Sequence, residues 1–214
     1  MKKSILTFAI FFFSTLTIFA NSDEKFMKAM GSTIPGIFKA TNLEEMTPII
    51  NKLTRIASAE PEKWEPSYYT GFAYIRLSQM SKVPAEKDKY IDLAIEQINK
   101  GISIAPGESE METLKGYALM MKMVVDPMTR GQEYSPLVFG SFQKAIAMNE
   151  KNPRAWMLLG QMQLGTAQFF NSGTEEGCAT VNKSINLFNS QESPNPIYPS
   201  WGLQSAKEVV KSCK

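Results

Sequence analysis

Histidine is absent from the 214 residues of this chain. Its absence excludes Ser-His-Asp and Cys-His nucleophile systems and histidine-based zinc sites, and it removes the commonest general base. Pairs of carboxylates, such as Glu44 with Glu45 and Glu175 with Glu176, could still do acid-base work. These pairs lie at expected helix ends, where acidic residues cap a helix or complement its dipole. The sequence therefore predicts no catalytic residue, no cofactor and no enzyme activity.

An excess of basic charge is also missing. Lys2 and Lys3 precede an apolar run from Ile5 to Phe19, and Ala20 ends an acceptable signal-peptidase site, so residues 1–20 are expected to be a cleaved signal peptide. An uncleaved anchor is the alternative, although the run is short for a bilayer span. Without Lys2 and Lys3, the 23 basic residues fall to the number of acidic ones, 21. The neutral mature chain predicts no nucleic-acid partner and no membrane insertion, and we expect it in the periplasm or secreted.

A long-period repeat is present. Gly71, Gly116 and Gly160 stand 45 and 44 residues apart, which is the scale of a stacked helical array. Ten residues before these glycines stand Pro61, Pro106 and Glu150. A glycine in mid-helix costs about 1 kcal/mol relative to alanine, so we expect each one to mark a close crossing by a neighbouring helix. Each unit then consists of a helix A with the glycine, a turn, a helix B and a stop.

These units resemble the tetratricopeptide repeat. Trp156, Leu159 and Gly160 match the W-x2-L-G pattern of that repeat. The A-x3-F pattern and the proline after it are matched by Ala94, Ile98 and Pro106. The resemblance implies an all-α fold, a right-handed α-α superhelix of the TPR-like solenoid type with N- and C-terminal capping helices. Because the units are ten or eleven residues longer than the 34 of the family, HEAT and armadillo arrays remain the alternative.

The resemblance can be narrowed. The strings VDPMTRGQEYSP and NEKNPRAWMLLGQ look like those of exported tetratricopeptide proteins of Bacteroidota-type bacteria, which implies only fold and export. The expected organisation has four parts. They are a signal peptide over 1–20, an N-terminal cap and half-repeat over 21–61, helical repeats over 62–189 and a C-terminal capping helix over 190–214.

The chain has only two cysteines, Cys178 and Cys213. If the last B helix and the final helix pack as an antiparallel pair that folds near residue 195, these two residues face each other. In an oxidising compartment we expect a disulfide, worth about 3 to 4 kcal/mol in the chain-entropy model. The alternative is two free thiols packed as small apolar side chains.

In tetratricopeptide arrays the A helices line the concave face. In this sequence, the positions expected to face inward lie before and after each glycine, on one face of helix A. The candidate partner-binding residues are Tyr68, Phe72, Arg76, Tyr117, Met121, Arg154, Met157 and Gln161. An aromatic and methionine-rich groove with basic residues suits a protein or peptide partner of acidic character. Arg76 and Arg154 are expected to be exposed, whereas Phe72 and Tyr117 could equally be interhelical core. The expected function is an exported scaffold for a protein or peptide, such as an envelope assembly factor.

The surplus residues of each unit give a second candidate surface. They are expected to form loops over 82–89, 125–133 and 169–176, which all join helix A to helix B and so emerge on one rim with Arg130. The alternative is that these residues only lengthen the turns.

Methionine is unusually frequent, with 13 residues. Met120, Met121, Met123 and Met128 lie close together, and thioether clusters can hold Cu(I) in exported proteins. This gives an alternative function, a small-ligand or Cu(I) binding protein that uses the methionine and aromatic groove. Because the other methionines are spread along the chain as core filler would be, no metal site is assigned.

Overall fold

The computed structural model describes residues 23–213. Within them, a helix over 23–39 is followed by eight more helices and by no strand. These are α2 (Leu43–Ala59), α3 (Glu65–Met80), α4 (Pro84–Ile104), α5 (Ser109–Val125), α6 (Pro127–Met148), α7 (Pro153–Phe169), α8 (Glu175–Ser190) and α9 (Leu203–Val210). The predicted signal peptide over 1–20 lies outside the described residues. In the part that is described, every helix is too short or too polar to cross a membrane.

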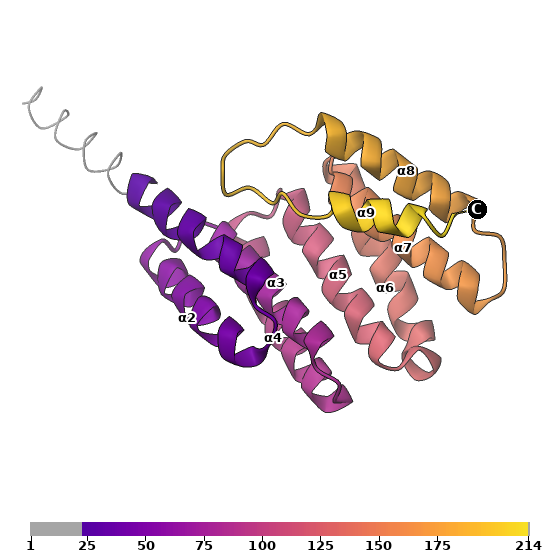
Figure 1. Ribbon diagram of the computed structural model, residues 1–214, viewed down its shortest axis with the longest axis horizontal. Helices are drawn as coiled ribbons and strands as arrows, with labels where there is room; N and C mark the ends of the chain where they lie inside the picture. The colour runs from indigo at the N-terminus through magenta and orange to yellow at the C-terminus, as the bar shows by residue number, and fades with distance from the viewer. Residues whose placement is uncertain (1–22, 214) are drawn as a thin grey trace, which may run out of the picture.

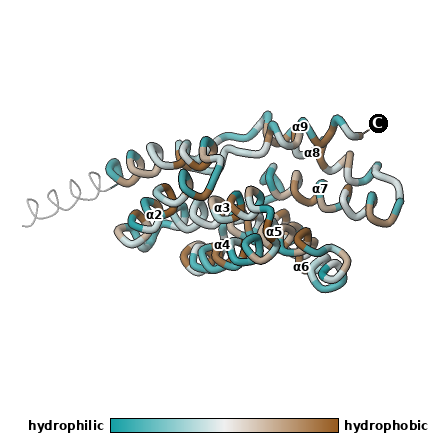
Figure 2. The backbone as a smooth tube through the Cα atoms, turned by 60° about the horizontal axis from the view of Figure 1, so that its bottom comes forward, coloured by the Kyte–Doolittle hydropathy of each residue, from teal (hydrophilic) through white to brown (hydrophobic). Residues whose placement is uncertain are grey.

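Consecutive helices pack as hairpins. α3 packs along α4, α5 along α6 and α7 along α8, and each hairpin stacks on the next one (Figure 1). α3, α5 and α7 are the A helices, and they also contact one another in sequence order. In Figure 2, hydrophobic and hydrophilic stretches alternate along the helices, as expected when each helix buries one stripe. The predicted all-α fold, a right-handed α-α superhelix, is confirmed.

The repeated glycines lie where helices cross most closely. A β-carbon on Gly160 would lie 2.5 Å from Cγ2 of Val181 and 3.0 Å from the backbone nitrogen of the same residue. On Gly71 and Gly116, it would come within 3.0 Å of side chains of α4 and α6. The predicted close crossings at these three glycines are confirmed, and they fix how each A helix lies against its B helix.

The surplus residues of each unit lie mostly in helices instead of turns. α4 begins at Pro84 and α6 at Pro127, so most of the first two expected rim loops is helical. Proline fits the first turn of a helix because its missing N–H group needs no partner there. The side chain of Asp126 caps α6 by accepting a backbone hydrogen bond. The prediction of two long loops is therefore wrong, and Arg130 lies in the first turn of α6.

The N-terminal segment is more regular than its sequence suggests. Residues 23–39 form one helix although it contains Gly31, Pro35 and Gly36, which are residue types that disfavour a helix interior. Burial of one apolar face against α2 and α3 overrides these weak propensities. The buried side chains of this face include Phe26, Met30 and Ile37.

The C-terminal segment has less helix than predicted. A C-terminal capping helix was expected within 190–214, but α9 covers only Leu203–Val210. Gly202, directly before it, has φ of 114°, which is outside the helical region. Residues 191–202 therefore form a separate extended connection between α8 and α9.

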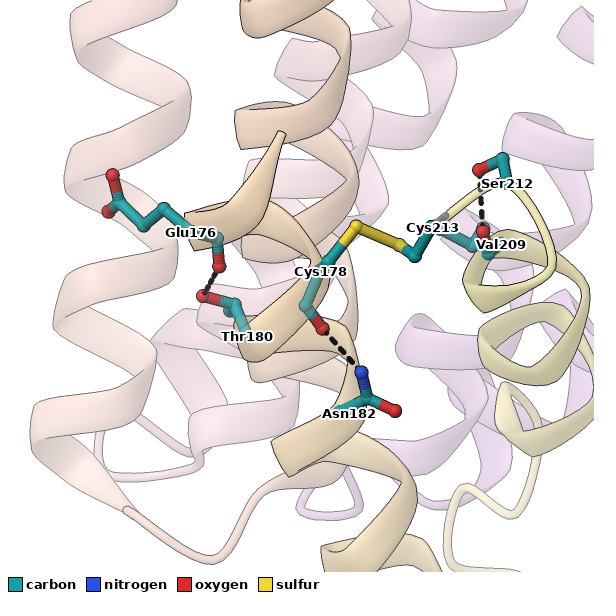
Figure 3. The surroundings of a disulfide bond; sticks show 7 residues. All are labelled: Glu176, Cys178, Thr180, Asn182, Val209, Ser212 and Cys213. Carbon is teal, nitrogen blue, oxygen red and sulfur yellow. Dashed lines mark hydrogen bonds between the residues drawn. A yellow bond between two sulfur atoms is a disulfide. The ribbon is translucent and has the colours of Figure 1, made fainter. Parts of the chain in front are cut away.

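A disulfide joins this C-terminal segment to the last hairpin. Cys178 on α8 and Cys213, just after α9, are bonded, with a Cα–Cα distance of 5.8 Å (Figure 3). The predicted pairing is confirmed, and neither cysteine is a free thiol. Because disulfides persist in oxidising compartments, the bond is consistent with export.

Candidate functional site: the concave groove

The concave face formed by α3, α5 and α7 is crossed by the chain itself. The connection over 191–202 leaves α8, runs back toward the N-terminal half and returns to α9 (Figure 1). Ile197 of this connection is only 1% exposed and packs in the core that α3 and α5 share. The C-terminal segment therefore covers part of the A-helix face, as a bound peptide would.

Hydrogen bonds from the A helices hold this connection in place. Tyr69 of α3 donates from its hydroxyl to the backbone oxygen of Ile197 at 2.9 Å. The indole N–H of Trp201 donates to the hydroxyl oxygen of Tyr68 at 2.9 Å. Arg154 of α7 donates from Nη1 to the backbone oxygen of Trp201 at 3.1 Å. Three different A-helix side chains thus fix the connection before α9 begins.

Arg154 is a correction to the sequence prediction, which placed it on the surface. Its side chain is fully buried and pairs with Glu110 of α5, whose carboxylate is also buried, at 2.9 Å between Nε and Oε2. Burial raises the pKa of Glu110, and the positive charge of Arg154 opposes that rise. Arg154 is inaccessible because Glu110 lies on one side of it and the Trp201 segment covers it. Tyr68, also fully buried, lies beneath the same segment.

Beside the connection, the concave face retains an open cavity of about 730 Å³. Its floor comes from α3, α5 and α7, one wall from the N-terminal helix and the other wall from the segment that leads into α9. The lining residues are Phe38, Phe72, Arg76, Gln79, Tyr117, Met157, Leu158, Gln161, Ser200, Trp201, Gly202, Leu203, Gln204 and Ser205. We refer to this cavity as the concave groove.

Stacked aromatic rings form the main apolar surface of the concave groove. The indole of Trp201 stacks on Phe72 with ring centroids 4.8 Å apart and planes 22° apart. It also stacks on Tyr117, at 5.9 Å and 27°. On the opposite wall, Phe38 is 42% exposed and lies 5.7 Å from Phe72. The groove therefore offers flat aromatic surfaces from three separate parts of the chain.

Polar side chains also line the concave groove: Arg76, Gln79, Gln161, Ser200, Gln204 and Ser205, with the hydroxyl of Tyr117. Arg76 is its one charged lining residue, and its guanidinium lies 6.0 Å from the ring centroid of Phe38. Gln79 donates from Nε2 to the hydroxyl oxygen of Tyr117 at 2.7 Å. Burial raises the pKa of Tyr117, so its hydroxyl keeps its proton at neutral pH.

The eight predicted partner-binding residues fall into three groups, and the predicted rim residue Arg130 lies apart from them. Five line the concave groove: Phe72, Arg76, Tyr117, Met157 and Gln161. Tyr68 and Arg154 lie under the C-terminal connection, and the sulfur of Met121 accepts a hydrogen bond from Gln79, next to the groove. Arg130 lies elsewhere, in a bidentate pair with Asp88 of α4 at 2.6 and 2.7 Å. The binding role of all of these residues stays a prediction.

Two parts of the groove were missed by the sequence analysis, the wall from Trp201 and the wall from Phe38. The signal for Trp201 was available, because a connection of about a dozen residues that includes Ile197, Tyr198 and Trp201 has too many large apolar side chains to stay in water. Phe38 gave no such signal, since Pro35 and Gly36 directly before it disfavour a continuous helix.

The methionine cluster separates in the structure. Met120 is 7% exposed and packs in the core around α7, whereas Met128 is 81% exposed on α6. Met123 accepts a hydrogen bond from Ser135, as Met121 does from Gln79. Among the described residues there is also no group of three or more carboxylate or cysteine side chains that could hold a metal ion. Nothing in this arrangement favours the Cu(I) alternative.

No family model and no curated protein matches the sequence. Among solved structures, the chain is similar to the HusA haemophore from Porphyromonas gingivalis. The sequences are 25% identical, the TM-score is 0.77, and the alignment covers 87% of this chain and 92% of the haemophore. The chain is also similar to a thermophilic TPR protein from Thermus thermophilus, with 12% identity, a TM-score of 0.58 and coverage of 79% and 73%. That second likeness shows the fold alone.

The resemblance to a TPR-like protein of Bacteroidota is confirmed, because the haemophore comes from a bacterium of that group and the second structure has the tetratricopeptide fold. Neither of them is named as an enzyme.

Proposed function

We propose that the protein is an exported helical scaffold whose concave groove binds a flat, largely apolar small ligand of the tetrapyrrole class. The observation that carries this proposal is the cavity of about 730 Å³ with Trp201 stacked on Phe72 and Tyr117 along its wall. This volume falls within the range of roughly 300 to 1,000 Å³ typical of small-molecule sites. The similarity over most of both chains to a protein named a haemophore, a haem carrier, supports the same ligand class.

The side chains available in the groove favour stacking over metal ligation as the source of affinity. Haem iron in proteins is held by histidine, cysteine thiolate, methionine or tyrosine. This chain has no histidine, and both cysteines are in the disulfide. Tyr117 keeps its proton because burial raises its pKa, which disfavours the phenolate, and Met157 is 1% exposed. Aromatic contacts therefore supply most of the attraction for a flat ring system.

A second candidate is the scaffold for a protein or peptide partner, for example in envelope assembly. It is favoured by the way Tyr69 and Arg154 donate to carbonyl oxygens of an extended segment on the concave face. In this structure the segment is the chain's own connection over 191–202. A partner peptide would have to displace it or lie beside it, whereas a small ligand fits the cavity that remains.

The proposal is tested by titration of the mature protein with iron protoporphyrin IX, followed by absorbance. We expect Phe38→Ala to weaken binding about 3- to 10-fold, because one aromatic contact is worth roughly 0.5 to 1.5 kcal/mol. The melting temperature should change little, because the ring is 42% exposed. Phe170→Ala is the matched control, since Phe170 is 71% exposed and does not line the groove. Absence of saturable binding by the parent, or equal weakening by both variants, contradicts the proposal.

A further inference from the structure

Within the concave groove, the positive charge of Arg76 has no opposite charge to balance it. All the other lining residues are uncharged. We propose that the ligand of the groove carries a carboxylate and that Arg76 and Tyr117 bind this group, while the aromatic wall takes the flat body. This inference rests on the proposed function, and it names the chemical group that the site requires.

Arg76 lacks the ion pair that other arginines packed between helices in the described chain form. Arg130 forms a bidentate pair with Asp88, and Arg154 pairs with Glu110. Arg76 is half-buried and has no ion pair with any described residue. Its Nε atom is buried and has no hydrogen-bond partner. Nη2 of Arg154 also lacks one, but the charge of Arg154 is balanced by Glu110, so only Arg76 combines an unpartnered donor with an unbalanced charge among these three arginines.

A buried donor without a partner is uncommon in folded proteins and needs an explanation. The cost of leaving it is greatest for a charged group, because the guanidinium has lost water on the side of Phe38 and gained no acceptor. A carboxylate in the groove would accept from this side chain in the planar geometry that guanidinium groups favour. The same carboxylate would balance the charge.

Tyr117 supplies a second donor. Its hydroxyl oxygen already accepts from Gln79, so the hydroxyl proton is left to donate, and no acceptor for it is found among the described residues. Arg76 and Tyr117 line the same groove, and the positive charge of Arg76 acts against the rise in the pKa of Tyr117 that burial causes. A carboxylate between them would receive one charged and one neutral hydrogen bond.

The groups proposed to bind the carboxylate and the aromatic ring proposed to bind the flat body come from different elements. Arg76 is on α3 and Tyr117 on α5, whereas Trp201 belongs to the segment before α9. A ligand with a flat apolar body and an acid group at its edge satisfies both. An apolar ring system without an acid group would leave Arg76 desolvated and unpaired, so the groove is expected to discriminate against it.

The test compares protoporphyrin IX, which carries two carboxylates, with its dimethyl ester, which has the same ring system and no charge. Binding to the mature protein is measured by fluorescence titration at neutral pH. We expect the parent to prefer the diacid about tenfold or more, the range for a charge-assisted hydrogen bond. Arg76→Gln should bind the diacid about tenfold less tightly and show no preference. Arg55→Gln, which removes the same charge from an exposed position on α2, should behave as the parent does.

The outcomes separate this inference from the proposed function. If the parent binds diacid and ester equally, the requirement for a carboxylate is overturned while tetrapyrrole binding stands. If neither compound binds, both proposals fall. The comparison on the parent needs no variant, so a folding defect in Arg76→Gln would not prevent a decision. Equal diacid binding by Arg76→Gln and the parent would also overturn the assignment of Arg76.

Discussion

The guanidinium of Arg154 joins three parts of the molecule. It pairs with Glu110 of α5, its own backbone lies in α7, and it donates to the backbone of Trp201 in the C-terminal connection. A buried ion pair adds little stability relative to a well-packed apolar pair, but loss of one partner leaves an uncompensated buried charge. At this position, therefore, the pair serves mainly to fix the connection on the concave face.

Replacing Arg154 by methionine tests this role. We expect Arg154→Met to lower the free energy of unfolding by about 3 to 5 kcal/mol, because Glu110 would be left buried without a countercharge. The double variant with Glu110→Gln should lose less than the sum of the two single losses, since no charge then remains in the site. Denaturant unfolding of the four proteins measures both quantities. Additive losses would mean that the two side chains do not act as a pair.

Five of the residues that line the concave groove were predicted from the sequence, but the accessibility of the candidate residues was not. Phe72, Arg76 and Tyr117, which were chosen because they flank the glycines on one helix face, all line the concave groove. The same pattern could not show that Arg154 is buried, because its cover comes from Trp201, 47 residues later in the chain. Periodicity reports which face a residue occupies, and only tertiary contacts decide what lies over that face.

At the scale of single elements, the glycines set the stacking of the array. Gly160 lets the backbone of α8 approach α7, since a β-carbon there would meet the backbone nitrogen of Val181 at 3.0 Å and the backbone oxygen of Gly177 at 3.1 Å. Backbone atoms cannot rotate away as side chains can. The crossing of α7 and α8 therefore depends on the absence of a side chain at this one position.

We predict opposite effects for two alanine substitutions in α7. Gly160→Ala should destabilise the protein by about 1 to 3 kcal/mol, because it overpacks the α7–α8 crossing. Gly165→Ala should stabilise it by roughly 0.5 to 1 kcal/mol, because the space around that glycine is open and alanine is the better helix former. Thermal unfolding of both variants gives the sign directly. Stabilisation by Gly160→Ala would show that the crossing does not need a glycine.

Among the helix boundaries, the starts of the B helices were the hardest to predict from the sequence. Pro84 and Pro127 were interpreted as parts of loops, although both stand in the first turn of a helix. A proline signals a helix stop or a helix start depending on the residues after it. Pro136 lies inside α6, so a long helix can also accommodate a proline in its interior.

On the scale of the whole molecule, the C-terminal connection turns an open helical array into one with a bounded groove. Trp201 belongs to both hydrophobic clusters of the described chain, one around α3 and one around α7. The disulfide between Cys178 and Cys213 ties the end of this segment to α8. The sequence predicted the pairing of the cysteines, but not that the connection between their helices would lie on the concave face.

A flat ligand is proposed to occupy the cavity beside Trp201. The most direct measurement is two-dimensional NMR of the isotope-labelled mature protein during titration with protoporphyrin IX. The indole N–H signal of Trp201 should shift saturably, because the ligand ring would lie against this side chain. The signal of Trp156 should stay unchanged, since that indole donates to the backbone oxygen of Glu150 outside the concave groove. A shift at Trp156 without one at Trp201, or no saturable shift at either, would contradict the proposal.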